Sequence, residues 1–258
     1  VGCVSIGQGG VPLLLRHCNV SPDRITIVPA DNRGKDVARE YGVRFIIDPL
    51  MPHNHETIIR SHIGQGDFLL NLSVNVASTA LIEFCQRNGV LYLDTCIEPW
   101  PGGYTDPSRS ISERSNYVLR EEALKLRSLS MEGPRPTAVV AHGANPGMVS
   151  HFVKQALLNI AADNGMQVEP PTTRETWARL AKNLGIKVIH IAERDTQASP
   201  VPKKIGEFVN TWSIDGFHSE SSQPSEMGWG THEKKMPKDG KKHSFGNGSA
   251  IYLEQPSF

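Results

Sequence analysis

The sequence predicts an α/β protein: a Rossmann-type, doubly wound parallel sheet followed by part of a second, α+β domain. Apolar, strand-like segments alternate with helix-like segments through residues 1–150. A glycine-rich turn follows the first apolar segment, as in doubly wound folds. After Gly165 the expected strands are no longer separated by helices. We therefore expect one domain at residues 1–150 and a truncated second domain at 151–258.

The first stretch, residues 1–17, has the order strand, tight turn and helix. We expect a turn through Ser5, Gly7 and Gly9–Gly10, with the helix starting near Pro12. Such a turn lets backbone N–H groups meet the pyrophosphate of a dinucleotide. Gly2 and Gly7 hold the first and third positions of the GxGxxG pattern, but Val4 occupies the second, where glycine gives the ligand room. These residues alone are equally compatible with an ordinary strand-to-helix turn.

The rest of the first domain continues the alternation of strands and helices. The expected strands are Ile25–Val28, Val43–Ile47, Asp67–Val74, Val90–Asp94 and Thr137–Ala141. The expected helices are Lys35–Tyr41, His55–Ile63, Thr79–Asn88, Ser112–Leu129 (ended by Pro134–Pro136) and Met148–Ala162. We expect residues 101–106 to form a loop.

Asp31 follows the second expected strand, where an acidic residue holds the adenine ribose of a bound dinucleotide. It is equally suited to cap the next helix. The lack of an arginine cluster here favours NAD over NADP, although Arg33 weakens that inference.

Polar side chains gather where the expected parallel strands end, and ligands of doubly wound sheets bind at those ends. Each residue alone is also suited to an ordinary turn or cap, but as a group they indicate a functional site. A further turn, HGANPG, places Asn145 at a helix entrance after another strand. The strand-end candidates are Asn71, Ser73, Asn75, Asp94, Thr95 and Glu98.

The second part of the chain has a more antiparallel character. We expect a helix at Arg174–Gly185, strands at Lys187–Glu193, Phe208–Ile214 and Ala250–Leu253, and a loop at Ser219–Trp229. The lysine-rich stretch at residues 231–243 is expected to be a solvated loop.

Composition limits the partners. The 27 basic and 27 acidic side chains balance, which gives no indication of nucleic-acid binding. No apolar stretch is long enough to span a membrane, and no metal-binding spacing is present. Four scattered cysteines fit a reducing compartment, so a cytoplasmic location is expected. The chain starts inside a core strand and ends just after a strand-like run, so we expect a fragment.

Several segments together resemble the homospermidine synthase family, within the saccharopine-dehydrogenase-like group. They are SIGQGGVPLL, FLLNLSV, LYLDTCIEPW, RSNYVLRE, GANPGMVSHFVKQALLN, IAERDTQ, NTWSIDGFHSE and EMGWGTHE. Family chains are considerably longer, so the resemblance implies that a C-terminal portion is missing here, and with it an active-site histidine.

The resemblance implies a polyamine-forming reaction. Putrescine, or spermidine, is oxidised to an imine with NAD⁺, ammonia or diaminopropane leaves, and a second putrescine attacks. The same NADH then reduces the new imine, so NAD is recycled. A homodimer is also implied.

The resemblance also implies site residues. Asn75 stands where the family often has aspartate. The catalytic set would be Glu193, Trp212, Glu220 and Asn145; the substrate-binding set adds Glu98 and Asn75; the NAD-binding set would be Gly2, Ser5, Ile6, Gly7, Asn71, Ser73, Asp94 and Thr95. Carboxylates and an aromatic face suit a flexible dication.

Two other functions fit the sequence. A dehydrogenase of the saccharopine or carboxynorspermidine type would need an arginine for its substrate carboxylate, whereas the implied site offers Glu98, Glu193 and Glu220. A non-catalytic dinucleotide-binding protein would account for Val4 and Asn75.

Overall fold

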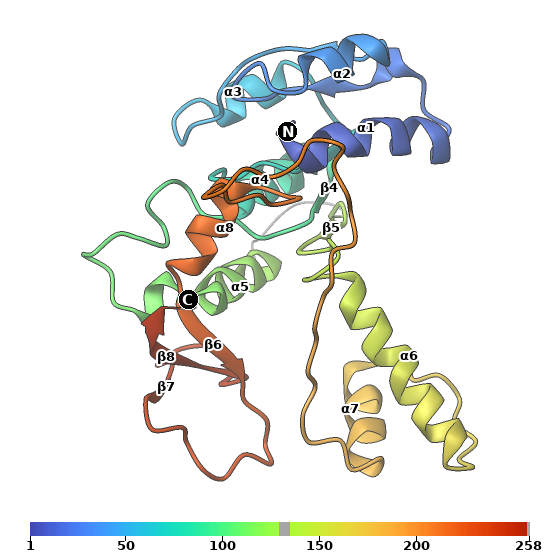
Figure 1. Ribbon diagram of the computed structural model, residues 1–258, viewed down its shortest axis with the longest axis vertical. Helices are drawn as coiled ribbons and strands as arrows, with labels where there is room; N and C mark the ends of the chain where they lie inside the picture. The colour runs from blue at the N-terminus through green and yellow to red at the C-terminus, as the bar shows by residue number, and fades with distance from the viewer. Residues whose placement is uncertain (129–134, 257–258) are drawn as a thin grey trace.

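Figure 1 shows the computed structural model of the chain, which describes residues 1–128 and 135–256. Its helices are α1 (Ser5–His17), α2 (Lys35–Glu40), α3 (His55–Arg60), α4 (Ser78–Asn88), α5 (Asn116–Lys125), α6 (Met148–Asp163), α7 (Arg174–Asn183) and α8 (Ile214–Ser221). Its strands are β1 (Thr26–Ile27), β2 (Arg44–Phe45), β3 (Phe68–Asn71), β4 (Leu91–Asp94), β5 (Ala138–Val139), β6 (Pro224–Gly228), β7 (Gly240–Lys242) and β8 (Ala250–Pro256). No helix of the described residues is long and apolar enough to cross a membrane.

The strands of the first half are all parallel. β1 pairs with β2, and β4 lies between β3 and β5. Val1 and Gly2 connect these two groups: the Val1 amine donates to the Leu70 carbonyl (2.7 Å), the Leu72 N–H donates to the Val1 carbonyl (2.8 Å), and the Gly2 N–H donates to the Val28 carbonyl (3.2 Å). The spatial order is therefore β2, β1, residues 1–2, β3, β4, β5. This is the doubly wound order, and the predicted fold class is confirmed.

The core lies between this sheet and α4. Leu81 and Phe84 of α4 are almost completely buried and belong to one cluster with Leu69 of β3 and Tyr92 of β4. Gly89 ends α4 in the left-handed conformation that favours glycine (φ 69°). Burial of this apolar face fixes α4, and with it the loops that follow β3 and β4.

The second half is built differently. α6 and α7 pack together through Leu157, Ala161 and Leu180. β6, β8 and β7 form an antiparallel sheet, with β8 in the middle. Glu226 of β6 accepts the backbone N–H groups of Asn116 (2.7 Å) and Tyr117 (3.0 Å), so this sheet is tied to the N-terminus of α5.

The predicted start of the first helix is wrong. α1 begins at Ser5, and the expected turn residues Gly7 and Gly9–Gly10 lie inside it, as does Pro12. The helix starts early because Gly7 packs directly on the chain before it: a β-carbon at Gly7 would lie 2.8 Å from the Gly2 carbonyl oxygen. Close packing therefore outweighs the low helix propensity of glycine.

The single long helix predicted from Ser112 is also wrong. Residues Ser112–Arg114 and Leu126–Ser128 form 3₁₀ turns on either side of α5. Ser115 caps α5 by accepting the Val118 N–H (3.3 Å), so the helix starts after it. Leu129 and Pro134 lie outside the described residues.

Two predicted strands and one predicted loop differ in the structure. Lys187–Glu193 is extended but is not a strand, and no described strand lies alongside to pair with it; Val188 is 74% exposed. Residues 208–213 are likewise unpaired, and Ile214 begins α8, which is capped by Ser213. The expected loop at Ser219–Trp229 contains the end of α8 and all of β6. Apolar alternation thus predicted strands where no partner strand is present.

Candidate functional site

A cavity of about 280 Å³ opens where the sheet order reverses. Gly2, Cys3 and Val4 line one side of it, at the N-terminus of α1. Asp31 and Arg33 line it beyond β1. The loop after β3, and Ser213 and Asp215 around the start of α8, complete the wall. The first N–H groups of a helix have no partner within the helix, so the N-terminus of α1 suits an anionic group.

The geometry of two glycines fits a dinucleotide. Gly2 has φ 81°, and a β-carbon there would lie 2.7 Å from both the Leu72 carbonyl carbon and the Ser73 Cα. Gly7 is buried against Gly2, which is the close packing that the third glycine of the fingerprint provides. Val4 precedes α1 and lines the cavity, so its isopropyl group occupies space that the pattern leaves free.

The predicted NAD-binding residues divide into two groups. Gly2 and Ser73 line the cavity. Ser5, Ile6 and Gly7 lie in the first turn of α1 and are not among the lining residues, and Ile6 is 49% exposed. The remaining three, Asn71, Asp94 and Thr95, are outside the lining; Asn71 and Asp94 are 2% and 0% exposed.

Asp31 and Arg33 form a two-point ion pair at the cavity wall. The Arg33 Nε donates to both Asp31 oxygens (3.0 and 2.9 Å), and its Nη2 lies 2.7 Å from Oδ2. The hydrogen bonds from Arg33 lower the pKa of Asp31. Asp31 lies three residues before Gly34, which precedes α2, so the structure supports the cavity position rather than the alternative role as a helix cap.

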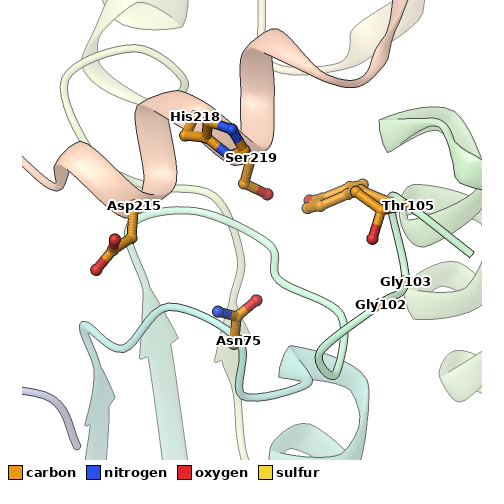
Figure 2. Close-up of a pocket in the computed structure, with 8 residues that line it drawn as sticks. Asn75, Gly102, Gly103, Thr105, Asp215, His218 and Ser219 are labelled. Carbon is orange, nitrogen blue, oxygen red and sulfur yellow. The ribbon is translucent and has the colours of Figure 1, made fainter.

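A second cavity, of about 350 Å³, adjoins the first and shares Asn75 and Asp215 with it. Figure 2 shows Asn75 on one side and Asp215, His218 and Ser219 of α8 on the other, with the loop at Gly102–Thr105 closing the end. Asn75 has a left-handed backbone (φ 63°). The second cavity therefore lies between the loop after β3 and helix α8.

Glu98 is a buried carboxylate beside this region. It is 8% exposed, and its Oε2 atom is buried and has no hydrogen-bond partner among the residues that the structure describes. Its backbone is fixed on α4, because the Ser78 N–H donates to the Glu98 carbonyl (2.8 Å) and the Glu98 N–H donates to Ser78 Oγ (3.0 Å). Burial raises the pKa of Glu98 to about 7, and the nearby Glu220 and Asp94 add to this effect.

Glu220, at the end of α8, contributes to the same negative region. Partial desolvation raises its pKa, although much of the residue is exposed. Burial, and then the nearby carboxylates Glu98 and Glu220, raise the pKa of the Cys96 thiol. Within the described part of the chain, none of the ion pairs joins Glu98 or Glu220 to a basic side chain, and such a group of carboxylates favours a cationic ligand.

The other predicted catalytic residues lie further apart. Trp212 packs on the first turn of α8, 3.1 Å from a β-carbon position at Gly216, and against Phe217 (ring centroids 6.1 Å apart). Asn145 is exposed in the turn before α6. Glu193 is exposed in the extended segment after α7 and lines neither cavity.

Comparison with known proteins shows to which family the chain belongs. Residues 1–136 match the family model of the saccharopine dehydrogenase NADP binding domain, and residues 143–258 match that of the saccharopine dehydrogenase C-terminal domain. The chain belongs to the saccharopine dehydrogenase family. Within that family it is 48% identical over 260 residues to the homospermidine synthase of Blastochloris viridis and 46% identical over 262 residues to that of Mesorhizobium japonicum. The predicted resemblance is confirmed.

A solved structure of this saccharopine dehydrogenase-type fold agrees closely. The homospermidine synthase of Legionella pneumophila, in complex with NAD, superposes with a TM-score of 0.84 at 44% identity over 99% of this chain. This chain covers 53% of that structure and 54% and 53% of the two curated relatives. It therefore spans about half the length of the relatives it matches.

Sequence reasoning missed part of the site. Asp215 and His218 line the second cavity, but they lie between the strand expected to end at Ile214 and the loop expected to begin at Ser219, so their spacing on a helix was not recognised. Tyr104 lines the same cavity, and its hydroxyl donates to the Ile97 carbonyl (3.3 Å). Among the described residues, no group of three histidine, cysteine or acidic side chains is placed to hold a metal ion.

Proposed function

We propose that the protein to which this chain belongs is a homospermidine synthase. It transfers an aminobutyl group from putrescine or spermidine to putrescine through imine intermediates, with release of ammonia or diaminopropane. The identities of 46–48% to two homospermidine synthases support this function. Because the chain spans half of those relatives, the complete reaction belongs to the whole protein.

We propose NAD as the cofactor. When bound, it accepts a hydride from the amine and returns a hydride to the imine. The glycine contact at Gly2, the N-terminus of α1 and the Asp31 carboxylate are the parts of this chain that would hold its pyrophosphate and ribose. The Legionella pneumophila relative was solved with NAD, which supports the same choice here.

The observation that carries the proposal is the Oε2 atom of Glu98, which is buried and accepts no hydrogen bond from any described residue. A buried carboxylate oxygen without a donor is costly, and an ammonium group supplies both charge and donors. With a pKa of about 7, Glu98 also exchanges a proton readily near neutrality, which suits deprotonation of an amine before hydride transfer. Glu220 adds a second negative group.

We assign the remaining roles as proposals. Glu98, Asn75, Glu193 and Glu220 bind ammonium groups; Trp212 holds a cationic intermediate against its ring; Asn145 orients the reacting amine near the nicotinamide. A cation over a desolvated indole gains about 2 kcal/mol. For Glu193, this requires its exposed segment to close on the cavities when substrate binds.

Homodimerisation, a cytoplasmic location and the domain boundary at residue 150 remain predictions. The four free cysteines fit a reducing compartment.

Product analysis of the whole protein with putrescine and catalytic NAD⁺ tests the function. Homospermidine and ammonia in equal amounts, without net NADH, are expected. Accumulating NADH without homospermidine would indicate a plain amine dehydrogenase. A requirement for a carboxylated substrate would favour the saccharopine or carboxynorspermidine type, and NAD binding without turnover would favour a non-catalytic protein.

A further inference from the structure

A chain of hydrogen bonds runs beneath the candidate site and joins the ends of β3, β4 and β5. Both Ser73 N and Oγ donate to Asn71 Oδ1, and Asn71 Nδ2 donates to the Tyr92 hydroxyl (3.2 Å). The Tyr92 hydroxyl donates to Asp94 Oδ2 (2.7 Å), and the Ala141 N–H donates to Asp94 Oδ1. Asn71, Tyr92 and Asp94 are at most 2% exposed.

The chain has a fixed direction. The Tyr92 hydroxyl donates to one oxygen of Asp94 and the Ala141 N–H donates to the other. The Tyr92 oxygen is then free to accept from Asn71, whose amide oxygen faces Ser73. Removal of the Tyr92 hydroxyl would take a donor from Asp94 Oδ2 and an acceptor from Asn71 Nδ2, while Asp94 keeps its hydrogen bonds to Ala141 and Ser78.

One end of this chain of hydrogen bonds, at Asp94, fixes the turn that carries Asn145. Ala141 has φ 54°, a left-handed conformation that alanine rarely adopts, and its N–H is held by Asp94. The next residue, His142, donates its N–H to the Asp94 carbonyl (2.9 Å). A β-carbon on Gly143 would lie 2.8 Å from the Thr95 carbonyl oxygen, so the turn rests directly on the residue after Asp94.

The other end of this chain of hydrogen bonds, at Ser73, fixes part of the wall of the first cavity. Ser73 lines that cavity and lies against Gly2. The loop from Ser73 continues to Asn75, which lines both cavities. The loop that lines both cavities and the turn that carries Asn145 are therefore joined through a few buried atoms.

We propose that Tyr92 and Asp94 are positioning residues, which hold the Ser73 loop and the Asn145 turn in a fixed relation for the transfer reaction. This assignment changes the role of Asp94, which the sequence placed among NAD contacts, and adds Tyr92, which it did not single out. The proposal rests on the proposed function, because the turn matters to catalysis only if Asn145 acts there.

Tyr92→Phe in the whole protein tests this role, because it removes one oxygen atom and keeps the buried ring. We expect kcat for homospermidine formation to fall roughly 10-fold at saturating NAD, and NAD affinity to weaken about 3-fold. Amide hydrogen exchange should become roughly 10-fold faster in residues 71–76 and 138–147. The matched control is Tyr117→Phe, since Tyr117 is also buried and its hydroxyl bonds Asn247 and Gly248.

A second variant tests whether the turn at Ala141 is the part that the Tyr92 hydroxyl holds in place. Glycine adopts a left-handed backbone freely, so Ala141→Gly added to Tyr92→Phe should recover part of the lost kcat. The double variant also provides the test if Tyr92→Phe alone does not fold. Equal kcat and equal exchange rates in Tyr92→Phe and Tyr117→Phe would overturn the proposal.

The two proposals fail in different ways. If the wild-type protein makes no homospermidine, the proposed function is wrong, and the exchange rates still decide the positioning role. Faster exchange in both segments of Tyr92→Phe, but not of Tyr117→Phe, would then support the hydrogen-bond chain, and unchanged exchange would refute it.

Discussion

A β-carbon on Gly2 would lie 2.7 Å from the Cα atom of Ser73. Two loops that are far apart in the sequence thus touch backbone to backbone at the point where the sheet order reverses. The cavity opens beside this contact, between the start of α1 and the loop after β3.

Gly2→Ala should therefore disrupt the cavity. The new methyl group overlaps the Leu72–Ser73 backbone and must also adopt φ 81°, so we expect a loss of about 3 kcal/mol in the free energy of unfolding. Gly165→Ala is the control, because Gly165 has φ 70° and open space around it; it should cost about 1 kcal/mol. Urea denaturation of both variants checks this, and equal losses would mean that Gly2 is not tightly packed.

Val4→Gly should tighten NAD binding. The change removes an isopropyl group from the cavity wall and leaves glycine, which is acceptable before a helix. We expect the Kd for NAD, measured by titration calorimetry, to fall roughly 10-fold, equivalent to about 1.4 kcal/mol. An unchanged Kd would show that Val4 does not obstruct the pyrophosphate.

Asp31→Ala should shift the cofactor preference toward NADP. The substitution removes an acceptor for the ribose hydroxyls and frees Arg33 from its two-point pair, so the guanidinium can meet a 2′-phosphate. We expect the ratio of NADP to NAD affinity to rise roughly 10-fold. The control Arg33→Ala should not bind NADP more tightly. If both variants behave alike, the pair does not select the cofactor.

Glu98 should make stability depend on pH. Its pKa is about 7 in the folded protein, above the ordinary 4.5, so the folded state binds more protons than the unfolded state between these values. The free energy of unfolding should therefore fall as pH rises from about 4.5 to 7, by about 3 kcal/mol in total. Glu98→Gln should remove this decline. Between pH 5 and pH 8, the free energy of unfolding should therefore fall less in the variant than in wild type.

Urea denaturation at the two pH values measures that difference. Glu40→Gln, at the exposed end of α2, controls for loss of a negative charge. A parallel pH dependence in wild type and Glu98→Gln would contradict the raised pKa of Glu98.

The sequence predicted those parts of the fold that local patterns determine. The apolar runs of β3 and β4 and the glycine after α4 locate these elements closely. The start of α1 was missed because it depends on the contact between Gly7 and Gly2, which are neighbours only after folding. Lys187–Glu193 reads as a strand because its side chains alternate, yet a strand also needs a paired neighbour.

The site was predictable to a similar extent. Strand-end reasoning identified Ser73 and Asn75, which line cavities, and Glu98, which is buried beside them. It also selected Asn71 and Asp94, which are buried under the site and both hydrogen-bond Tyr92. Residue type and position do not reveal whether a polar side chain hydrogen-bonds a buried neighbour or faces a cavity. Asp215 could be recognised as a cavity residue only once helix α8 was known.

The most direct test of aminobutyl transfer with recycled NAD follows the transferred hydride. The whole protein would be supplied with catalytic NAD⁺ and putrescine carrying deuterium on its amine-bearing carbons, together with excess unlabelled NADH, and homospermidine would be analysed by mass spectrometry. If the cofactor stays bound through both steps, the product retains all of the deuterium of both putrescines. A product that has lost one deuterium would show exchange of NADH between the steps, and absence of labelled homospermidine would contradict the transfer itself.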